Sequence, residues 1–161
     1  MQPLLLRIDD RLLHAKVLFT WASVLQPARI VLASDAVAHD PVRRAVYATL
    51  PCEVAGIAVE DLRAAAASLR DSVAAQTLFV CGTPDEVLRL HEMGGDFTRV
   101  NLGGLHPGVG KRPLLPFVSL SQQDCADLQA LLRRGVEVEA RELPGARSVP
   151  VQATELEALW K

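Results

Sequence analysis

Short apolar runs and longer segments with helical spacing alternate along the whole chain. Runs that are apolar on both faces are typical of buried strands. The sequence predicts such strands over residues 4–8, 29–33, 53–59, 77–81, 99–102 and 115–120. Helical periodicity, capping residues and prolines in first turns predict helices over 17–25, 41–50, 60–75, 83–94, 121–134 and 152–160. Residues 136–143 alternate between apolar and charged side chains, which predicts a half-exposed edge strand.

This alternation of strands and helices predicts a single α/β domain over residues 1–161. Parallel strands need crossover connections, and the helices in those connections cover both faces of the sheet. We therefore expect an open three-layer domain with a mainly parallel sheet, helices on both faces and an antiparallel edge. Half of the 161 residues are hydrophobic, which is enough for one sizeable core.

Charge and cysteine usage narrow the function classes. The net charge is −2, from 17 basic and 19 acidic residues, so no basic surplus indicates a nucleic-acid partner. Cys52, Cys81 and Cys125 match no zinc or disulfide spacing, which favours a reducing cytosol. No apolar run reaches transmembrane length, and the start of the sequence lacks a signal-peptide pattern. We expect a cytoplasmic protein that reaches a membrane only through a partner.

Charged residues gather where the first strand leads into the first helix. They are Arg7, Asp9, Asp10, Arg11, His14 and Lys16. In open α/β sheets, ligands bind beyond the carboxyl ends of the strands. A neutral imidazole can take a phosphoryl group on nitrogen, arginines can contact its oxygens, and an aspartate can hold the other ring nitrogen. The alternative is a solvated cluster in which Asp9 or Asp10 caps the helix, and composition alone favours that alternative.

Weaker candidates lie further along the chain. Gly103 and Gly104 open a glycine-rich segment, 103–113, whose amides could approach an anion, although its spacing is not that of a phosphate-binding P-loop. That segment also holds Lys111 and Arg112, and His106, which we expect to be a loop residue. Asp35, after the second strand, could border the same cleft as His14 or simply cap a helix.

Cys81 and the histidines His39 and His91 are expected to have structural rather than catalytic roles. Cys81 precedes a helix start, which would activate a thiol, but such a cysteine is more often a small buried hydrophobe. His39 and His91 have no partner at metal-ligand spacing, so no metal site is expected.

The segment RIDDRLLHAKV, residues 7–17, resembles the signature of the IIB components of mannose/fructose/sorbose-type sugar phosphotransferase systems. That signature reads approximately R-I/V-D-D/S-R-L-I/L-H-G-Q-V. The resemblance continues through IVLASDAVAHDPVRR, through RVNLGGLHPGVGKRPLLPFVSLSQQD and through RRGVEVEAREL. It therefore covers essentially the whole chain in the right order.

The resemblance implies that His14 accepts a phosphoryl group from a phosphohistidine on a IIA partner. His14 would then pass the group to a hexose-type sugar during uptake through membrane-embedded IIC and IID partners. Arg7 and Arg11 would steady the phosphoryl charge, and no metal or organic cofactor would be needed. The protein would be cytoplasmic and peripheral to the membrane through IIC and IID. A homodimer could form if the edge strand at 136–143 pairs between copies.

The chain departs from the signature immediately after the histidine. Ala15 and Lys16 stand where the family usually has Gly-Gln. Alanine lacks the backbone freedom of glycine, and a lysine could either strengthen phosphate binding or make phosphohistidine a poorer donor. Two alternatives stay open: a regulatory phosphoacceptor that binds partners according to phosphorylation state, and a domain that binds a nucleotide or phosphometabolite through the glycine-rich segment.

Overall fold

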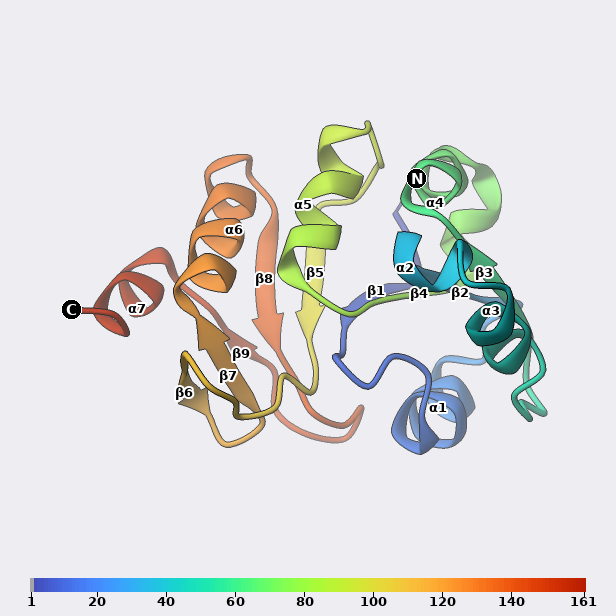
Figure 1. The fold of residues 1–161 in the computed structure, drawn as a ribbon, viewed down its shortest axis with the longest axis horizontal. Helices are drawn as coiled ribbons and strands as arrows, with labels where there is room; N and C mark the ends of the chain where they lie inside the picture. Colours follow the sequence, from blue (N-terminus) through green and yellow to red (C-terminus); the bar gives the residue numbers. More distant parts are fainter. Residues whose placement is uncertain (1) are drawn as a thin grey trace.

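The computed structural model describes residues 2–161. A seven-stranded sheet in the order β3-β2-β4-β1-β5-β8-β9 forms its centre (Figure 1). The strands are β1 (Leu5–Ile8), β2 (Arg29–Ala33), β3 (Gly56–Glu60), β4 (Thr77–Cys81), β5 (Arg99–Leu102), β8 (Glu137–Ala140) and β9 (Val149–Pro150). Neighbours from β3 to β8 pair in parallel, and β9 pairs antiparallel with β8. The prediction of a mainly parallel sheet with an antiparallel edge is confirmed.

Helices cover both faces of this sheet, as expected for a three-layer domain. One core cluster packs alternate strand residues, among them Leu6 and Ile8, beneath helices α4 (Leu62–Arg70), α5 (Pro84–Glu92) and α6 (Gln122–Arg133). The other cluster packs the opposite face against η1 (Lys16–Trp21), α1 (Ala22–Leu25) and α2 (Asp35–Ala38). Figure 1 shows α1 and α3 (Pro41–Ala48) on the side of the sheet away from α5 and α6. The remaining helices are η2 (Ser72–Gln76) and α7 (Ala153–Ala158).

Several boundaries differ from the sequence prediction for identifiable reasons. The helix expected over 60–75 is divided at Asp71, whose carboxylate accepts from the Val73 amide and starts η2. Ser34 and Asp40 cap two separate helices, α2 and α3, instead of preceding one. Residues 136–143 supply β8, which lies one position inside the edge, because the two-residue strand β9 pairs with it on the outside.

A small hairpin begins at the end of the glycine-rich segment. Strands β6 (Lys111–Leu115) and β7 (Val118–Ser121) pair antiparallel in a sheet of their own. The sequence predicts β7 but not β6, because the basic pair and the proline in β6 do not form an apolar run.

Among the helices of residues 2–161, none combines the length and apolar content that crossing a bilayer requires.

Candidate functional site

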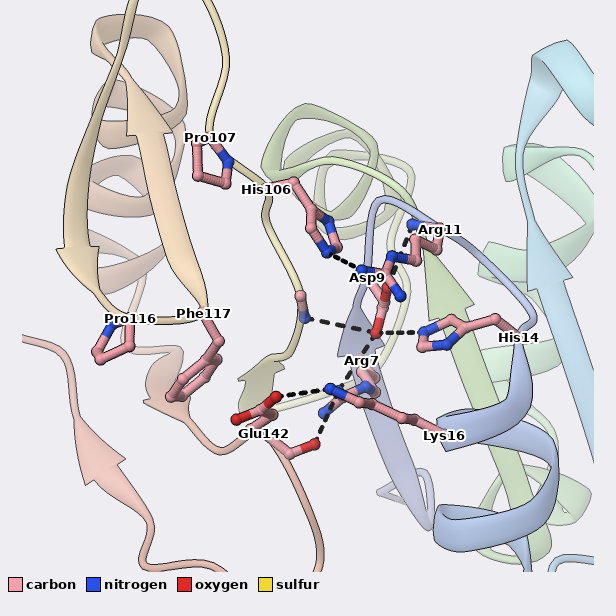
Figure 2. A pocket seen from close by; sticks show the side chains of 11 residues that line it. Arg7, Asp9, Arg11, His14, Lys16, His106, Pro107, Pro116, Phe117 and Glu142 are labelled. Carbon is pink, nitrogen blue, oxygen red and sulfur yellow. Dashed lines mark hydrogen bonds and ion pairs between the residues drawn. The ribbon is translucent and has the colours of Figure 1, made fainter.

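A cavity of about 170 Å³ lies at the carboxyl ends of β1 and β5. The chain after β1 turns toward one face of the sheet, and the chain after β5 leads to the β6–β7 hairpin, so a crevice opens between adjacent parallel strands. The residues that line this cavity are Arg7, Asp9, Arg11, His14, Lys16, Gly104, His106, Pro107, Pro116, Phe117 and Glu142 (Figure 2). Five of the six charged candidates from the first motif therefore meet here.

The turn after β1 separates side chains that enter the core from those that enter the cavity. Leu12 adopts a φ of 60°, and its amide donates to the carbonyl of Asp9 at 2.9 Å. A leucine in the left-handed region is strained, and such strain concentrates at functional sites. Leu12 and Leu13 are buried, while Arg11 is exposed and His14 is half-buried. His14 immediately precedes the first helix, since its carbonyl accepts from the amides of Val17 and Leu18.

Arg7 is fully buried beneath the cavity. Its Nη1 donates to Asn101 Oδ1 at 2.7 Å and to the Arg141 carbonyl at 2.9 Å. Its Nη2 donates to Asp9 Oδ2 at 3.3 Å and to the Glu142 carbonyl at 3.1 Å. The guanidinium also lies 4.9 Å from the ring centroid of Trp21. Burial lowers the pKa of Arg7, and the negative charge of Asp9 opposes that effect.

Gly103 is required by the position of Arg7. A Cβ atom at residue 103 would lie 2.2 Å from Cζ of Arg7 and 2.5 Å from its Nε. Among the described residues, nothing accepts a hydrogen bond from that Nε. We call Arg7, Asp9 and Asn101 the floor of the pocket. The floor supports the site from below, and any direct contact of Arg7 with a phosphoryl group stays a prediction.

Asp9 holds one nitrogen of the His14 ring. Its carboxylate is buried, with Oδ2 3.0 Å from Nε2 of His14 (Figure 2). The two atoms are at ion-pair distance, although the contact does not have the geometry of a hydrogen bond. Backbone amides of Arg11 and Gly104 donate to the same carboxylate at 3.2 and 3.4 Å. In the described part of the chain, Nδ1 of His14 has neither an ion-pair nor a hydrogen-bond partner, whereas Nε2 faces the Asp9 carboxylate, so Nδ1 is the ring nitrogen left for chemistry.

Two side-chain pairs lie above this floor, Arg11 with His106 and Lys16 with Glu142. We call these four residues and Asp10 the rim of the pocket. Nη2 of Arg11 lies 2.6 Å from Nε2 of His106, whose Nδ1 lies 2.5 Å from Asp10 Oδ1. Nζ of Lys16 donates to Oε1 of Glu142 at 2.6 Å. The rim pairs are partly exposed, with 42% of the Lys16 side chain and 39% of the Glu142 side chain accessible.

Sequence reasoning missed Glu142 and underestimated His106. Glu142 lies just past an alternating strand and carries no local motif, so its approach to Lys16, which is 126 positions away in the sequence, is a product of the fold. The available signal for the floor is the polar Asn101 between the apolar residues Val100 and Leu102, since buried polar groups need partners.

Ala15 stands where the family signature has glycine, and its backbone does not need the conformational freedom of glycine. Its φ of −53° and ψ of −42° lie in the right-handed helical region. An alanine therefore fits this backbone without strain, and the departure from the signature is confined to the side chain of Lys16.

The other candidates lie outside the cavity lining. Asp35 accepts from the Leu62 amide and from Arg89, each at 2.9 Å, and the Leu62 hydrogen bond is the main cause that lowers the pKa of Asp35. Arg112 lies over the Trp160 ring, 4.4 Å from its centroid, and neither Lys111 nor Arg112 lines the cavity. Asp35 thus lies outside the lining of the His14 cleft, and the basic pair of the glycine-rich segment gives the nucleotide-binding alternative no cation there.

The remaining cysteine and histidine candidates have structural surroundings. Cys81 is fully buried, and burial raises the pKa of its thiol well above the ordinary value. His39 pairs with Asp61 at 3.6 Å, and His91 makes an edge contact with Phe97 at 5.5 Å. No group of three His, Cys, Asp or Glu side chains within residues 2–161 is placed to hold a metal ion.

Comparison with known proteins gives a consistent result. The family model described as the sorbose subfamily IIB component of the phosphotransferase system matches residues 4–158. The fructose-specific EIIB component of Bacillus subtilis is 34% identical over 152 residues, which cover 92% of each chain. The N-acetylgalactosamine-specific IIB component 1 of Escherichia coli is 32% identical over 145 residues, 88% of this chain and 91% of that one.

A solved structure agrees with these sequence matches. The crystal structure of the sorbose permease IIB domain from Klebsiella pneumoniae superposes with a TM-score of 0.85 at 29% identity and covers 98% of both chains. The resemblance to this family and the α/β fold are therefore both confirmed. The chain belongs to the sorbose-subfamily IIB components of sugar phosphotransferase systems, which transfer phosphoryl groups in sugar uptake.

Proposed function

We propose that His14 is the phosphoryl carrier of this IIB component and that Nδ1 is the atom that takes the phosphoryl group. The observation that carries the proposal is the 3.0 Å approach of Asp9 Oδ2 to Nε2. A carboxylate at Nε2 favours the tautomer that is protonated there, which leaves the lone pair on Nδ1. Asp9 holds the Nε2 side of the His14 ring, and Nδ1 is left free to react in the cavity that His14 lines.

The transfer follows from this arrangement. Attack by Nδ1 forms a P–N bond on His14 while the P–N bond of the donor phosphohistidine breaks. The ring then carries positive charge, which the buried Asp9 carboxylate stabilises. In the second step a sugar hydroxyl attacks phosphorus, the P–N bond breaks, and the hydroxyl proton passes to water. Arg11 and Lys16 supply positive charge at the cavity wall, where positioning does most of the work in phosphoryl transfer.

The partners of this family are IIA donors, membrane IIC and IID components and a sugar. For this chain we propose that residues 1–161 act as one cytoplasmic unit that reaches the membrane through IIC and IID, which the match over residues 4–158 supports. The homodimer expected from the alternating segment has less support, since β9 pairs with the edge of β8 that a second copy would need. The regulatory alternative is not favoured, because the relatives described above are sugar-specific transport components.

Phosphorylation by the general phosphotransferase proteins and a IIA donor, followed by mass mapping, tests the proposal. We expect one acid-labile, alkali-stable phosphoryl group, present in wild type and in the control His39→Ala, and absent from His14→Ala. His39 is a suitable control because 68% of its side chain is exposed and it lies outside the cavity lining. A label that survives His14→Ala would overturn the assignment.

A further inference from the structure

We propose that His106 is a positioning residue, which holds the Arg11 guanidinium at the phosphoryl group of His14 while Asp10 fixes the tautomer of His106. This inference rests on the proposed function of His14 and assigns a role to a second histidine in the same cavity. His106 and Arg11 both line that cavity, and Figure 2 shows the contact between their side chains as a dashed line.

The tautomer of His106 follows from its partners. Asp10 receives two hydrogen bonds from His106: the backbone amide donates to Oδ2 at 2.7 Å, and Nδ1 lies 2.5 Å from Oδ1. On the other side of the ring, Nη2 of Arg11 lies 2.6 Å from Nε2. A guanidinium can only donate, so Nε2 must be the acceptor and Nδ1 must carry the proton. Asp10 therefore orients the ring so that it offers a lone pair to Arg11.

Arg11 depends on this acceptor for a defined position. It is exposed on a turn, and among the described residues His106 is its one side-chain hydrogen-bond partner. A free arginine side chain samples many rotamers, and restricting it to one costs conformational entropy. In a protein without this contact, that cost would add to the activation free energy of phosphoryl transfer. The contact with His106 uses a single N–H of Arg11, so the other guanidinium hydrogens stay available for phosphoryl oxygens.

His106 also keeps Arg11 away from a competing carboxylate. Asp10 is adjacent to Arg11 in the sequence and would otherwise accept its guanidinium in an ion pair. Both oxygens of Asp10 are already engaged by N–H groups of His106. The neutral ring thus stands between the acid and the arginine, and the positive charge of Arg11 remains uncompensated by a direct carboxylate contact.

Two substitutions separate the two contacts of the ring. In His106→Asn the amide NH2 group can take the place of Nδ1 toward Asp10, but the side chain is too short to reach Arg11. In His106→Gln the amide oxygen can take the place of Nε2 toward Arg11. The backbone hydrogen bond to Asp10 is retained in both variants. The probe is potassium phosphoramidate, a small donor whose P–N bond breaks as Nδ1 of His14 attacks, with ammonia as the leaving group.

We expect His106→Asn to have the same thermal unfolding temperature as the wild type. The variant should lower the maximal rate of His14 phosphorylation at least about tenfold, as for the loss of one preorganised donor. His106→Gln should recover most of that rate. In an Arg11→Gln background, His106→Asn should slow the reaction no further, because the two residues act through one contact.

A His106→Asn protein as fast as wild type would overturn the inference. An equal loss in the Arg11→Gln background would overturn it as well, since His106 would then act independently of Arg11. A His106→Gln protein as slow as His106→Asn would do the same. A wild-type protein that takes no phosphoryl group on His14 from either phosphoramidate or a IIA donor would overturn the proposed function itself, and this inference with it.

Discussion

The floor and the rim of the pocket hold their charges in opposite ways. On the floor, Arg7 and Asp9 are buried and each has several fixed partners. On the rim, Arg11 and Lys16 are partly exposed, and each has one side-chain partner among the described residues. Arg7 and Arg11 are four positions apart in one motif, so the comparison shows that spacing alone does not separate an arginine that builds the site from one that can contact its ligand.

The sharpest test of this contrast replaces each arginine in turn by methionine. Arg7→Met leaves the buried Asp9 carboxylate without its cation and should lower the free energy of unfolding by about 3–5 kcal/mol. Arg11→Met removes the same charge from the rim and should lower it by less than about 0.5 kcal/mol. Urea denaturation of both variants measures the difference. Equal losses would mean that burial does not distinguish the two arginines.

The same contrast appears at two neighbouring glycines. Gly103→Ala would place a Cβ 2.2 Å from the Arg7 guanidinium, which is fixed on four acceptors and cannot move aside without losing them. We expect this variant to lose about 1–3 kcal/mol of stability, as overpacked cores do, and to slow phosphorylation of His14. Gly104→Ala would place a Cβ 3.2 Å from the His106 ring, on the more exposed rim, and should cost clearly less. A larger loss for Gly104→Ala in thermal unfolding would reverse the floor and rim assignments.

The sequence predicts the sheet, both helix layers and the position of His14, because these depend on local periodicity and on one contiguous motif. It does not predict the two rim contacts that Glu142 and His106 make. Glu142 lies 126 positions from Lys16 and His106 lies 95 positions from Arg11 in the sequence, and neither position is marked by a local pattern. The sequence also overrates Asp35: the end of a parallel strand is a common ligand position, but here the carboxylate is used by the Leu62 amide and Arg89.

The rim pair Lys16–Glu142 should tune the lifetime of the phosphohistidine. Because Glu142 already engages the lysine, Lys16→Gln alone should change the half-life of phosphorylated His14 by less than about twofold. Glu142→Gln frees the cation to approach the phosphoryl group and should lengthen that half-life about two- to fivefold, an effect that salt reduces. The double variant should return to the wild-type value. A half-life that Glu142→Gln leaves unchanged would show that Lys16 does not respond to the phosphoryl charge.

Asp35 provides a reference outside both floor and rim, with the smallest expected effect. The Leu62 amide and Arg89 hold the pKa of this carboxyl below its usual value of 3.8, so its charge stabilises the folded state. That stabilisation is complete above the unfolded pKa and is lost as the pH falls through the lowered folded pKa. Asp35→Asn keeps an oxygen for the Leu62 amide and removes only the charge.

Because the Asp35 side chain is 34% exposed and its ion pair is screened, we expect Asp35→Asn to cost less than about 1 kcal/mol at pH 7. The difference from wild type should disappear in urea titrations at pH values below both pKa values of the carboxyl, while the rate of His14 phosphorylation at pH 7 stays at the wild-type value. A slower rate at unchanged stability would place Asp35 in the His14 cleft after all. A stability loss that persists in acid would mean that the side chain contributes by packing and not by charge.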